Sequence, residues 1–242
     1  MTGKLYGLGL GPGDPDLITL KAHRILQNVS VIAWPAPDTG PSFARAIAAP
    51  HLPGGQVEIP IVVPMRTDRF PAKDVYDKAA GEIAVQLDAG RDVAVLCEGD
   101  PFFYGSFMYL FERLAASYDT EVVPGVSSIM AAASAAGRPL AARNDVLTIV
   151  PGPLGDSELT DRINSADALA IIKIGRHFKR LRALIEKLNL LPHAIYVERV
   201  SLDAERLMPL AQVPEDTAPY FSMILIYKGG EDWIHALPGS TT

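Results

Sequence analysis

The feature that most constrains the fold is a short apolar run, residues 93–97, that ends directly on a turn with the sequence EGDP at residues 98–101. An uninterrupted apolar run of this length is typical of a strand buried on both faces of a parallel sheet. The turn bends the backbone sharply and leaves amide groups and a carboxylate exposed. Ligands bind at the carboxyl ends of such strands, so the junction is a candidate functional site. A simpler interpretation is a loop whose Asp100 caps a helix beginning near Ser106.

Strand and helix patterns alternate over the first 118 residues. Residues 4–10 have the pattern of a strand, and a GPGDP turn leads from it into a helix that opens at Asp16. A second strand over residues 30–34 is expected to end at the prolines that follow it, and a third covers residues 57–63. An amphipathic helix spans residues 74–87. This alternation predicts a mostly parallel sheet.

The pattern restarts after Tyr118, where a strand feeds an alanine-rich helix. Further strands are expected at residues 147–150, 168–172, 194–197 and 220–227, with one clear helix at 178–188. We therefore predict an α/β fold of two domains, residues 1–118 with a mostly parallel sheet and residues 119–242 with a mixed sheet, and a cleft between them.

Composition narrows the class of protein. Of the 242 residues, 48% are hydrophobic, and the formal charge is -6, which favours a globular chain and disfavours nucleic acid as a partner. Cys97 is the single cysteine and falls in the apolar run, so it is expected to be a small core residue, as suits a reducing cytoplasm. No apolar run approaches the roughly 20 residues that cross a bilayer, and no signal-peptide pattern opens the chain.

Common cofactor and catalytic motifs are missing from the sequence. The dinucleotide pattern G-x-G-x-x-G fails because Pro12 or Asp14 occupies its last position, and neither the phosphate-loop pattern nor G-x-S-x-G occurs. The five histidines lack the spacing of metal ligands, so no metal is expected. Three junctions, residues 9–15, 99–104 and 124–128, instead offer backbone amides and small residues. Such junctions suit an extended polar ligand.

These junctions carry a family resemblance. The segments GLGLGPGDPDLITLKA, GDPFFYGSF and VVPGVSSIMAAASAAGRPLA resemble, in order and spacing, the signature regions of the tetrapyrrole methylases of cobalamin and sirohaem synthesis. Residues 34–35, 64–65 and 219–222 look most like the branch that methylates precorrin-2 at carbon 20 to give precorrin-3A. The resemblance implies a homodimer of two-domain chains that hold S-adenosylmethionine, converted to S-adenosylhomocysteine, in the interdomain cleft.

The resemblance also implies roles for particular residues. Pro12 would border the cofactor, the main chain of residues 99–101 would wrap it, and two serines would contact its methionine end or sugar. Two apolar residues would line the adenine pocket, at positions where relatives often have Met and Ala. The expected cofactor-binding residues are Pro12, Gly99, Asp100, Pro101, Ser127, Ser128, Ile174 and Val200.

Methyl transfer to carbon depends mainly on positioning, but the meso carbon of the substrate must also lose a proton. Asp100 is the candidate proton acceptor, and Tyr104 is expected either to bond the substrate or to pack. A tetrapyrrole carries many carboxylates, which guanidinium and ammonium groups would bind. Arg138 and Arg143 lie near the later junctions, and the residues expected to bind the substrate are Arg66, Arg69, Lys173 and Arg176.

Three alternatives stay open at the level of sequence. The substrate could be cobalt-factor II of the anaerobic route, or the ring of another tetrapyrrole methylase. The chain could bind a nucleotide for regulation without catalysis, although the intact Asp100 and three complete junctions count against this. It could also methylate a macromolecule, although the lack of a basic face disfavours RNA.

Overall fold

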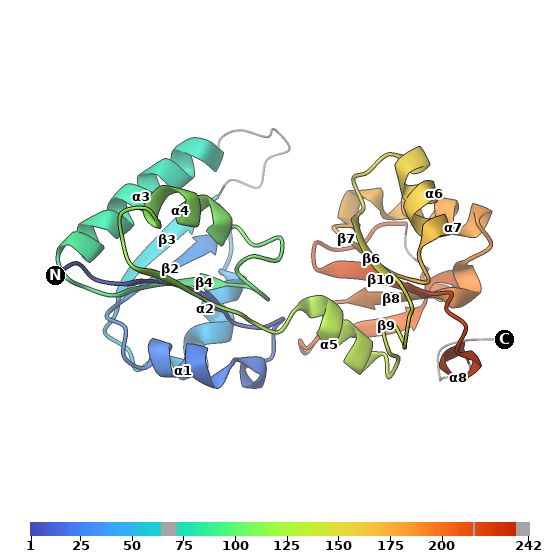
Figure 1. The fold of residues 1–242 in the computed structure, drawn as a ribbon, viewed down its shortest axis with the longest axis horizontal. Coiled ribbons are helices and arrows are strands. Elements are labelled where there is room, and N and C mark those ends of the chain that lie inside the picture. Colours follow the sequence, from blue (N-terminus) through green and yellow to red (C-terminus); the bar gives the residue numbers. More distant parts are fainter. Residues whose placement is uncertain (64–71, 215, 236–242) are drawn as a thin grey trace. The chain divides into compact units, whose positions relative to one another are not determined.

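The computed structural model describes residues 1–63, 72–214 and 216–235. The chain divides into two compact units, Met1–Ser127 and Ser128–Thr242, and each unit contains its own five-stranded sheet (Figure 1). Helices connect and cover the strands in both units. The predicted α/β class with two sheets is therefore confirmed.

The sheet of the first unit is parallel throughout, with the strand order β3-β2-β4-β1-β5. Because the strands run in one direction, all of their carboxyl ends lie at the same edge. The central position of β1 between β4 and β5 places three of the predicted junctions side by side. The strands are β1 (Leu5–Gly9), β2 (Val31–Ala36), β3 (Val57–Val62), β4 (Val93–Cys97) and β5 (Thr120–Val123).

Four helices cover the two faces of this sheet. Residues of α3 and α4, among them Ile83 and Leu110, pack with one face of the sheet, and residues of α1 and α2, among them Leu26 and Ile47, pack with the other (Figure 1). Apolar residues on both faces explain why β4 is buried at every position. The helices are α1 (Leu20–Leu26), α2 (Phe43–Ala48), α3 (Ala72–Asp88) and α4 (Phe107–Leu114).

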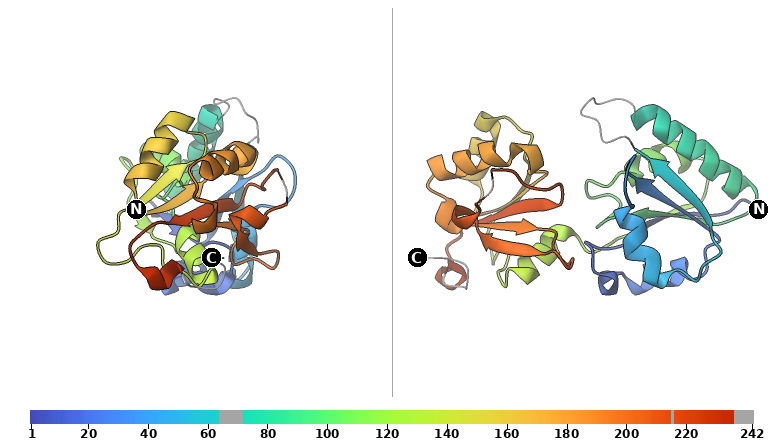
Figure 2. Two further views of the ribbon diagram at one scale, coloured as in Figure 1. Left: turned by 90° about the vertical axis from the view of Figure 1, so that its right-hand side faces the viewer. Right: turned by 180° about the vertical axis from the view of Figure 1, so that it is seen from behind.

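The second unit contains a mixed sheet, with the order β6-β7-β10-β8-β9, in which only the β6–β7 pair is parallel. Helices α6 and α7 cover one face and α5 covers the other (Figures 1 and 2). The strands are β6 (Leu147–Pro151), β7 (Ala168–Ile172), β8 (Ala194–Glu198), β9 (Arg206–Pro209) and β10 (Ser222–Tyr227). The helices are α5 (Ser128–Ala135), α6 (Asp156–Ser165), α7 (Phe178–Lys187) and α8 (Asp232–His235).

The strand β5 belongs to the sheet of the first unit, where Leu5 to Leu8 of β1 pair with Thr120 to Val123. The domain boundary expected from the sequence, between residues 118 and 119, precedes this strand. A new strand–helix pattern after Tyr118 does not reveal whether the strand joins the old sheet or starts another. In this chain it joins the old one, and the two units divide after Ser127.

Local details also differ from the sequence predictions. The strand β2 continues through Pro35 to Ala36, because these two residues still pair with Ile61 and Val62 of β3. The proline is tolerated there since pairing with β4 on the other side has stopped at Ala33. The first helix begins at Leu20 and not at Asp16. Thr19 caps it by accepting the amide of Ala22, while the preceding residues form a separate 3-10 turn.

Candidate functional site

The three glycine-rich junctions meet at the carboxyl edge of the first sheet. In the pairing register, Gly9 at the end of β1 lies opposite Cys97 at the end of β4, and Leu8 lies opposite Val123 of β5. The first two junctions are also hydrogen-bonded beyond the strands. The amide of Gly99 donates to the carbonyl of Gly11 at 2.7 Å, and the amide of Gly11 donates back at 3.2 Å. The three junctions predicted from the sequence therefore meet at one edge of the first sheet.

Three glycines allow the main chains of the junctions to approach one another. A Cβ atom on Gly9 would lie 2.4 Å from the amide nitrogen of Gly125, and one on Gly125 would lie 2.0 Å from the carbonyl oxygen of Gly99. Both distances are shorter than any contact that real Cβ atoms make. The junctions thus form one main-chain cluster, and a side chain at Gly9 or Gly125 would force it apart.

Asp100 joins the second junction to the third. Its Oδ1 accepts the amides of Phe102 at 2.9 Å and Phe103 at 3.1 Å, and its Oδ2 accepts the amide of Gly125 at 3.1 Å. The simpler interpretation, a cap on the following helix, is wrong, since no side chain caps α4 at Ser106. Instead the carboxylate holds its own turn closed and fixes the third junction against it.

Space remains open beside this cluster. Gly99 has a φ of +63°, and a Cβ added to it would meet no atom closer than the carbonyl oxygen of Val126 at 3.9 Å. Pro12 and Pro101 are buried in the flanking turns. Ser127 ends the first unit and Ser128 begins α5 in the second. The edge thus combines open space with turns of small and rigid residues, which suits a ligand bound through main-chain groups.

Apolar side chains are exposed directly after the second junction. Phe102, Phe103 and Tyr104 are followed by exposed Met108 and Tyr109 on the first turn of α4. Tyr104 has a φ of +56°, a conformation that residues other than glycine rarely adopt, and its ring lies 5.1 Å from that of Phe103. We call these five residues the exposed apolar segment. It is a surface on which a flat, largely apolar ring could pack.

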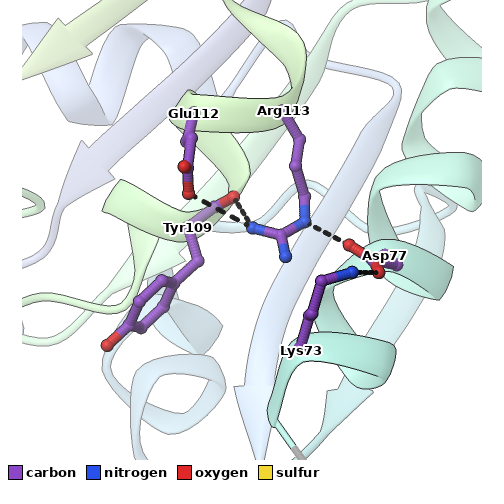
Figure 3. Close-up of polar contacts among 5 residues, drawn as sticks. All are labelled: Lys73, Asp77, Tyr109, Glu112 and Arg113. Atoms are coloured by element: carbon purple, nitrogen blue, oxygen red, sulfur yellow. Dashed lines mark hydrogen bonds and ion pairs between the residues drawn. The ribbon is translucent and has the colours of Figure 1, made fainter.

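Ionic contacts between α3 and α4 support this segment (Figure 3). Arg113 of α4 donates from Nε to Asp77 of α3 at 2.7 Å and from Nη1 to the carbonyl of Tyr109, also at 2.7 Å. Lys73 bonds the other oxygen of Asp77, and these two donors lower the pKa of that carboxyl below its usual value. The ring of Tyr109 packs at 5.0 Å against Tyr76 of α3. The two helices therefore hold the base of the exposed apolar segment in place.

Glu98 is a residue to which the sequence analysis gave no role. It follows β4 directly, and burial raises the pKa of its carboxyl above the ordinary value, although backbone hydrogen bonds from Glu98 itself and Ala44 oppose the rise. The carboxyl thus connects the end of β4 to the start of α2. A charged residue immediately after a buried strand was the available signal for this position.

In the second unit, β6, β7 and β8 end at one common edge, since β10 runs antiparallel to both β7 and β8. Three residues at the ends of β7 and β8 have left-handed backbone angles, Lys173 at +56°, Arg199 at +49° and Ser201 at +61°. Such conformations are costly for residues with side chains and concentrate at functional sites. This edge is therefore the candidate ligand-binding edge of the second unit.

A buried carboxylate organises arginines at the same edge. Glu198, only 4% exposed, accepts the hydroxyl of Tyr196 at 2.8 Å and forms ion pairs with Arg199 at 3.2 Å and Arg206 at 3.3 Å. Burial, followed by the bond to Glu198, raises the pKa of Tyr196. Both guanidinium groups are more than a third exposed. The sequence analysis missed these two arginines because their separation along the chain gave no pattern.

The remaining predicted residues fall in different surroundings. Lys173 and Arg176 are exposed at the edge of the second sheet, and Arg176 donates to the ring of His177 at 3.2 Å. The side chains of Ile174 and Val200 are buried in the hydrophobic core, at 0% and 6% exposure. Arg66 and Arg69 lie outside the described residues. Cys97 is 4% exposed in the core, as predicted, and burial raises the pKa of its thiol.

Within the part of the chain that the structure describes, no group of three or more His, Cys, Asp or Glu residues could hold a metal ion. None of the described helices is long and apolar enough to cross a membrane.

A parallel sheet with glycine-rich loops at its carboxyl edge, followed by a mixed sheet with a basic edge, is the architecture of an α/β protein that binds a small ligand. Residues 4–214 match the family described as Tetrapyrrole (Corrin/Porphyrin) Methylases. The chain belongs to this family, as the resemblance of its three segments predicted.

Individual relatives agree with the family match. The chain is 43% identical over 235 residues to the cobalamin biosynthesis protein CobIJ of Mycobacterium tuberculosis, but it spans only 46% of that protein's length. It is 38% identical to a precorrin-2 C(20)-methyltransferase of a Sinorhizobium species, over 93% of this chain and 95% of that one. A structure of uroporphyrin-III C-methyl transferase from Thermus thermophilus complexed with S-adenyl homocysteine shares the fold, with a TM-score of 0.67 and 24% identity over 92% and 97% of the two chains.

Proposed function

We propose that this chain transfers a methyl group from S-adenosylmethionine to carbon 20 of precorrin-2, which gives precorrin-3A in cobalamin biosynthesis. The observation that carries the proposal is the single main-chain cluster formed by Gly11, Gly99 and Gly125 at one sheet edge. The similarity to the Sinorhizobium enzyme over nearly the full length of both chains supports the choice of substrate.

The residues at the cluster fit the cofactor. A Cβ on Gly99 would meet only the carbonyl oxygen of Val126 within 4 Å, so a ligand group can approach the main chain at this position. The cofactor would be held at this edge by Pro12, Gly99, Asp100 and Pro101. Ser127 and Ser128, at the end of the third junction, would contact its methionine end or sugar. Ile174 and Val200, whose side chains are buried, would contribute through their main chain to the adenine pocket.

Bound S-adenosylmethionine supplies an electrophilic methyl group that an electron-rich carbon can attack in line. The chain contributes mainly position, which can account for a large part of the rate enhancement. Asp100 fixes the second junction to the third through its three amide contacts. It is also the proposed acceptor of the proton that the substrate carbon loses. Tyr104 stands beside it in the exposed apolar segment and would pack on the substrate ring or bond it.

We place the substrate carboxylates at basic side chains. Lys173 and Arg176 are exposed at the edge of the second sheet, where Arg199 and Arg206 share the buried Glu198. Fork-shaped guanidinium donors bind carboxylates in two places at once, and carboxylate side chains on a tetrapyrrole would be suitable acceptors. Arg66 and Arg69 remain proposed contacts from the sequence.

The test is an assay with S-adenosylmethionine carrying a 13C-labelled methyl group and precorrin-2 or its cobalt complex. We expect a product one methyl group heavier, with the label at carbon 20 by NMR, and the faster of the two substrates identifies the form of the ring that is used. An unlabelled tetrapyrrole together with tight cofactor binding would remove the catalytic claim and favour a binding role. The variant Arg162→Met, which replaces an exposed arginine on α6, is the control and should form the same labelled product.

We also propose that the chain forms a homodimer in the cytoplasm, as the family resemblance implies. Sedimentation velocity at micromolar concentration should give twice the mass of the chain. A species of monomer mass across the concentration range would remove this part of the proposal and leave the reaction untouched.

A further inference from the structure

A buried cation in the second unit lacks a counter-charge. Arg138, in the turn after α5, is 7% exposed. Its Nη1 donates one long hydrogen bond, 3.4 Å, to the carbonyl of His193, while Nε and Nη2 have no hydrogen-bond partner and are shielded from water. Among the described residues, no carboxylate forms an ion pair with this side chain.

A guanidinium in this position is costly, since removal of a charge from water is offset only by a paired and hydrogen-bonded partner. Burial lowers the pKa of Arg138, but arginine stays protonated in proteins. The ring of Tyr227 lies 5.4 Å from the guanidinium carbon and offers a cation–π contact. That contact leaves the Nε and Nη2 protons without an acceptor.

The neighbours of Arg138 do not supply an anion. The ring of His193 lies 5.3 Å from that of His235, which in turn lies 5.2 Å from the ring of Tyr227. Burial, and then the charges of His235 and Arg138, lowers the pKa of His193. The carboxylate of Asp145 accepts the Tyr227 hydroxyl and the amide of Ala142. Glu231, the other carboxylate that acts on Tyr227, pairs with Arg143 at 2.8 Å. Both carboxylates are thus bonded elsewhere, and the Nε and Nη2 protons of Arg138 are left for a guest anion.

The position of this cluster separates it from the proposed substrate contacts. Tyr227 is the last residue of β10, and His193 immediately precedes β8. Arg199 and Arg206 lie at the opposite end of β8, five residues along the strand. Since a strand rises by about 3.3 Å per residue, the two ends are roughly 16–17 Å apart.

We infer that Arg138 binds a small oxyanion, a carboxylate or a phosphate, at a site separate from the proposed substrate contacts of Arg199 and Arg206 in the second unit. Nε and Nη2 form one side of the guanidinium fork, and two oxygen atoms of such an anion would accept from both. His193 and His235 flank the site. Because both nitrogen atoms are shielded, rim side chains must move to admit the anion, and release is slow.

The experiment measures thermal unfolding of the whole chain in chloride, acetate and phosphate at constant ionic strength. For the wild type we expect a saturable rise with phosphate or acetate, about 5 °C or more at a hundred times Kd, and no rise with chloride. The acetate and phosphate series identify which oxyanion is preferred. Arg138→Met should lose the response and be at least as stable as the wild type in chloride, since it removes an unpaired buried charge. Arg162→Met should keep the response.

A second measurement needs no variant. Phosphate added to the wild type should shift the ring-proton NMR signals of His193 and His235 with the same midpoint as the thermal effect. The inference is overturned if the wild type is insensitive to both oxyanions, if chloride acts equally, or if Arg138→Met responds like the wild type. None of these outcomes depends on methyl transfer, so failure here is distinct from failure of the proposed function.

Discussion

The close contact between the main chains of the junctions leaves no room for an added methyl group at Gly9 or Gly125. We predict that Gly125→Ala forces the second and third junctions apart, because its Cβ would lie 2.0 Å from the carbonyl oxygen of Gly99. The expected result is a loss of at least tenfold in affinity for S-adenosylmethionine and a lower Tm, measured by calorimetry. Gly81→Ala is the matched control, since its Cβ meets no atom within 4 Å and α3 gains about 0.5–1 kcal/mol from the better helix former. Equal binding by both variants would contradict this account of the cluster.

Glu98 makes stability depend on pH. Because burial raises the pKa of its folded-state carboxyl above the ordinary value of 4.5, stability from this group is fully present below pH 4.5 and is lost as pH rises through the folded pKa. Glu98→Gln removes this dependence, so the Tm of the variant relative to wild type should increase from pH 4 to pH 7. A difference in Tm that stays constant across this range would show that the carboxyl does not titrate differently on folding.

Single residues also show where sequence reasoning stops. The turn around Asp100 could be predicted because glycine, aspartate and proline restrict the backbone locally. Its bond to Gly125 could not, since that contact depends on β1 lying between β4 and β5. The pairing of Glu198 with Arg206 likewise depends on the register of β8 and β9.

At the scale of elements, the pair of helices α3 and α4 is joined through Arg113 and Asp77 (Figure 3). Arg113 is 19% exposed and also bonds the carbonyl of Tyr109, so Arg113→Met should lower Tm by about 2–4 °C. The lowered pKa of Asp77 means that this stabilisation exists above pH 3.8 and is lost as pH falls through the folded pKa. The Tm difference from wild type should therefore shrink in acid.

Lys78→Met provides the comparison for this change. Lys78 pairs with Glu82 at 3.7 Å on the open surface of α3, and such exposed pairs contribute little to stability. Its Tm should match that of the wild type. If both variants lower Tm equally, the contact of Arg113 with Asp77 stabilises the protein no more than an exposed ion pair does, and the prediction is wrong.

Elements with strong periodicity were predicted correctly, and those governed by caps or edges were not. The spacing of apolar residues predicted β1, β4 and α7, because that spacing reflects which faces of a strand or helix are buried. The start of α1 was displaced because Thr19, and not the acidic turn before it, caps the helix. The end of β2 was missed because a proline is tolerated where neighbouring pairing has stopped.

At the scale of the whole molecule, the proposed function assigns the substrate carboxylates to basic side chains of the second unit, whereas the cofactor is held mainly by the main-chain cluster of the first. Arg199 and Arg206 belong to the second unit, whereas the main-chain cluster belongs to the first. Arg199→Met and Arg206→Met should therefore raise KM for the tetrapyrrole about tenfold or more, while binding of S-adenosylmethionine measured by calorimetry changes little. Arg199→Lys should recover only part of the loss, because an ammonium cannot bind in two places. An unchanged KM in both methionine variants would show that the substrate carboxylates bind elsewhere.

The number of sheets and their class could be predicted from the order of patterns, but membership of β5 could not. Its four residues are equally suitable for the edge of either sheet, and only pairing with β1 decides between them. Which of the two sheets a strand joins is thus decided by tertiary pairing and not by its own sequence.

The late position of β5 has a consequence for synthesis on the ribosome. Gly11 and Gly99 can meet once the first hundred residues have emerged, but the loop is not locked until Gly125 reaches the side of β1 opposite β4. A nascent chain that ends at residue 118 would contain four of the five strands of the first sheet and would lack the third junction. Capture of the methyl donor would then report that the last strand of the first unit has been inserted.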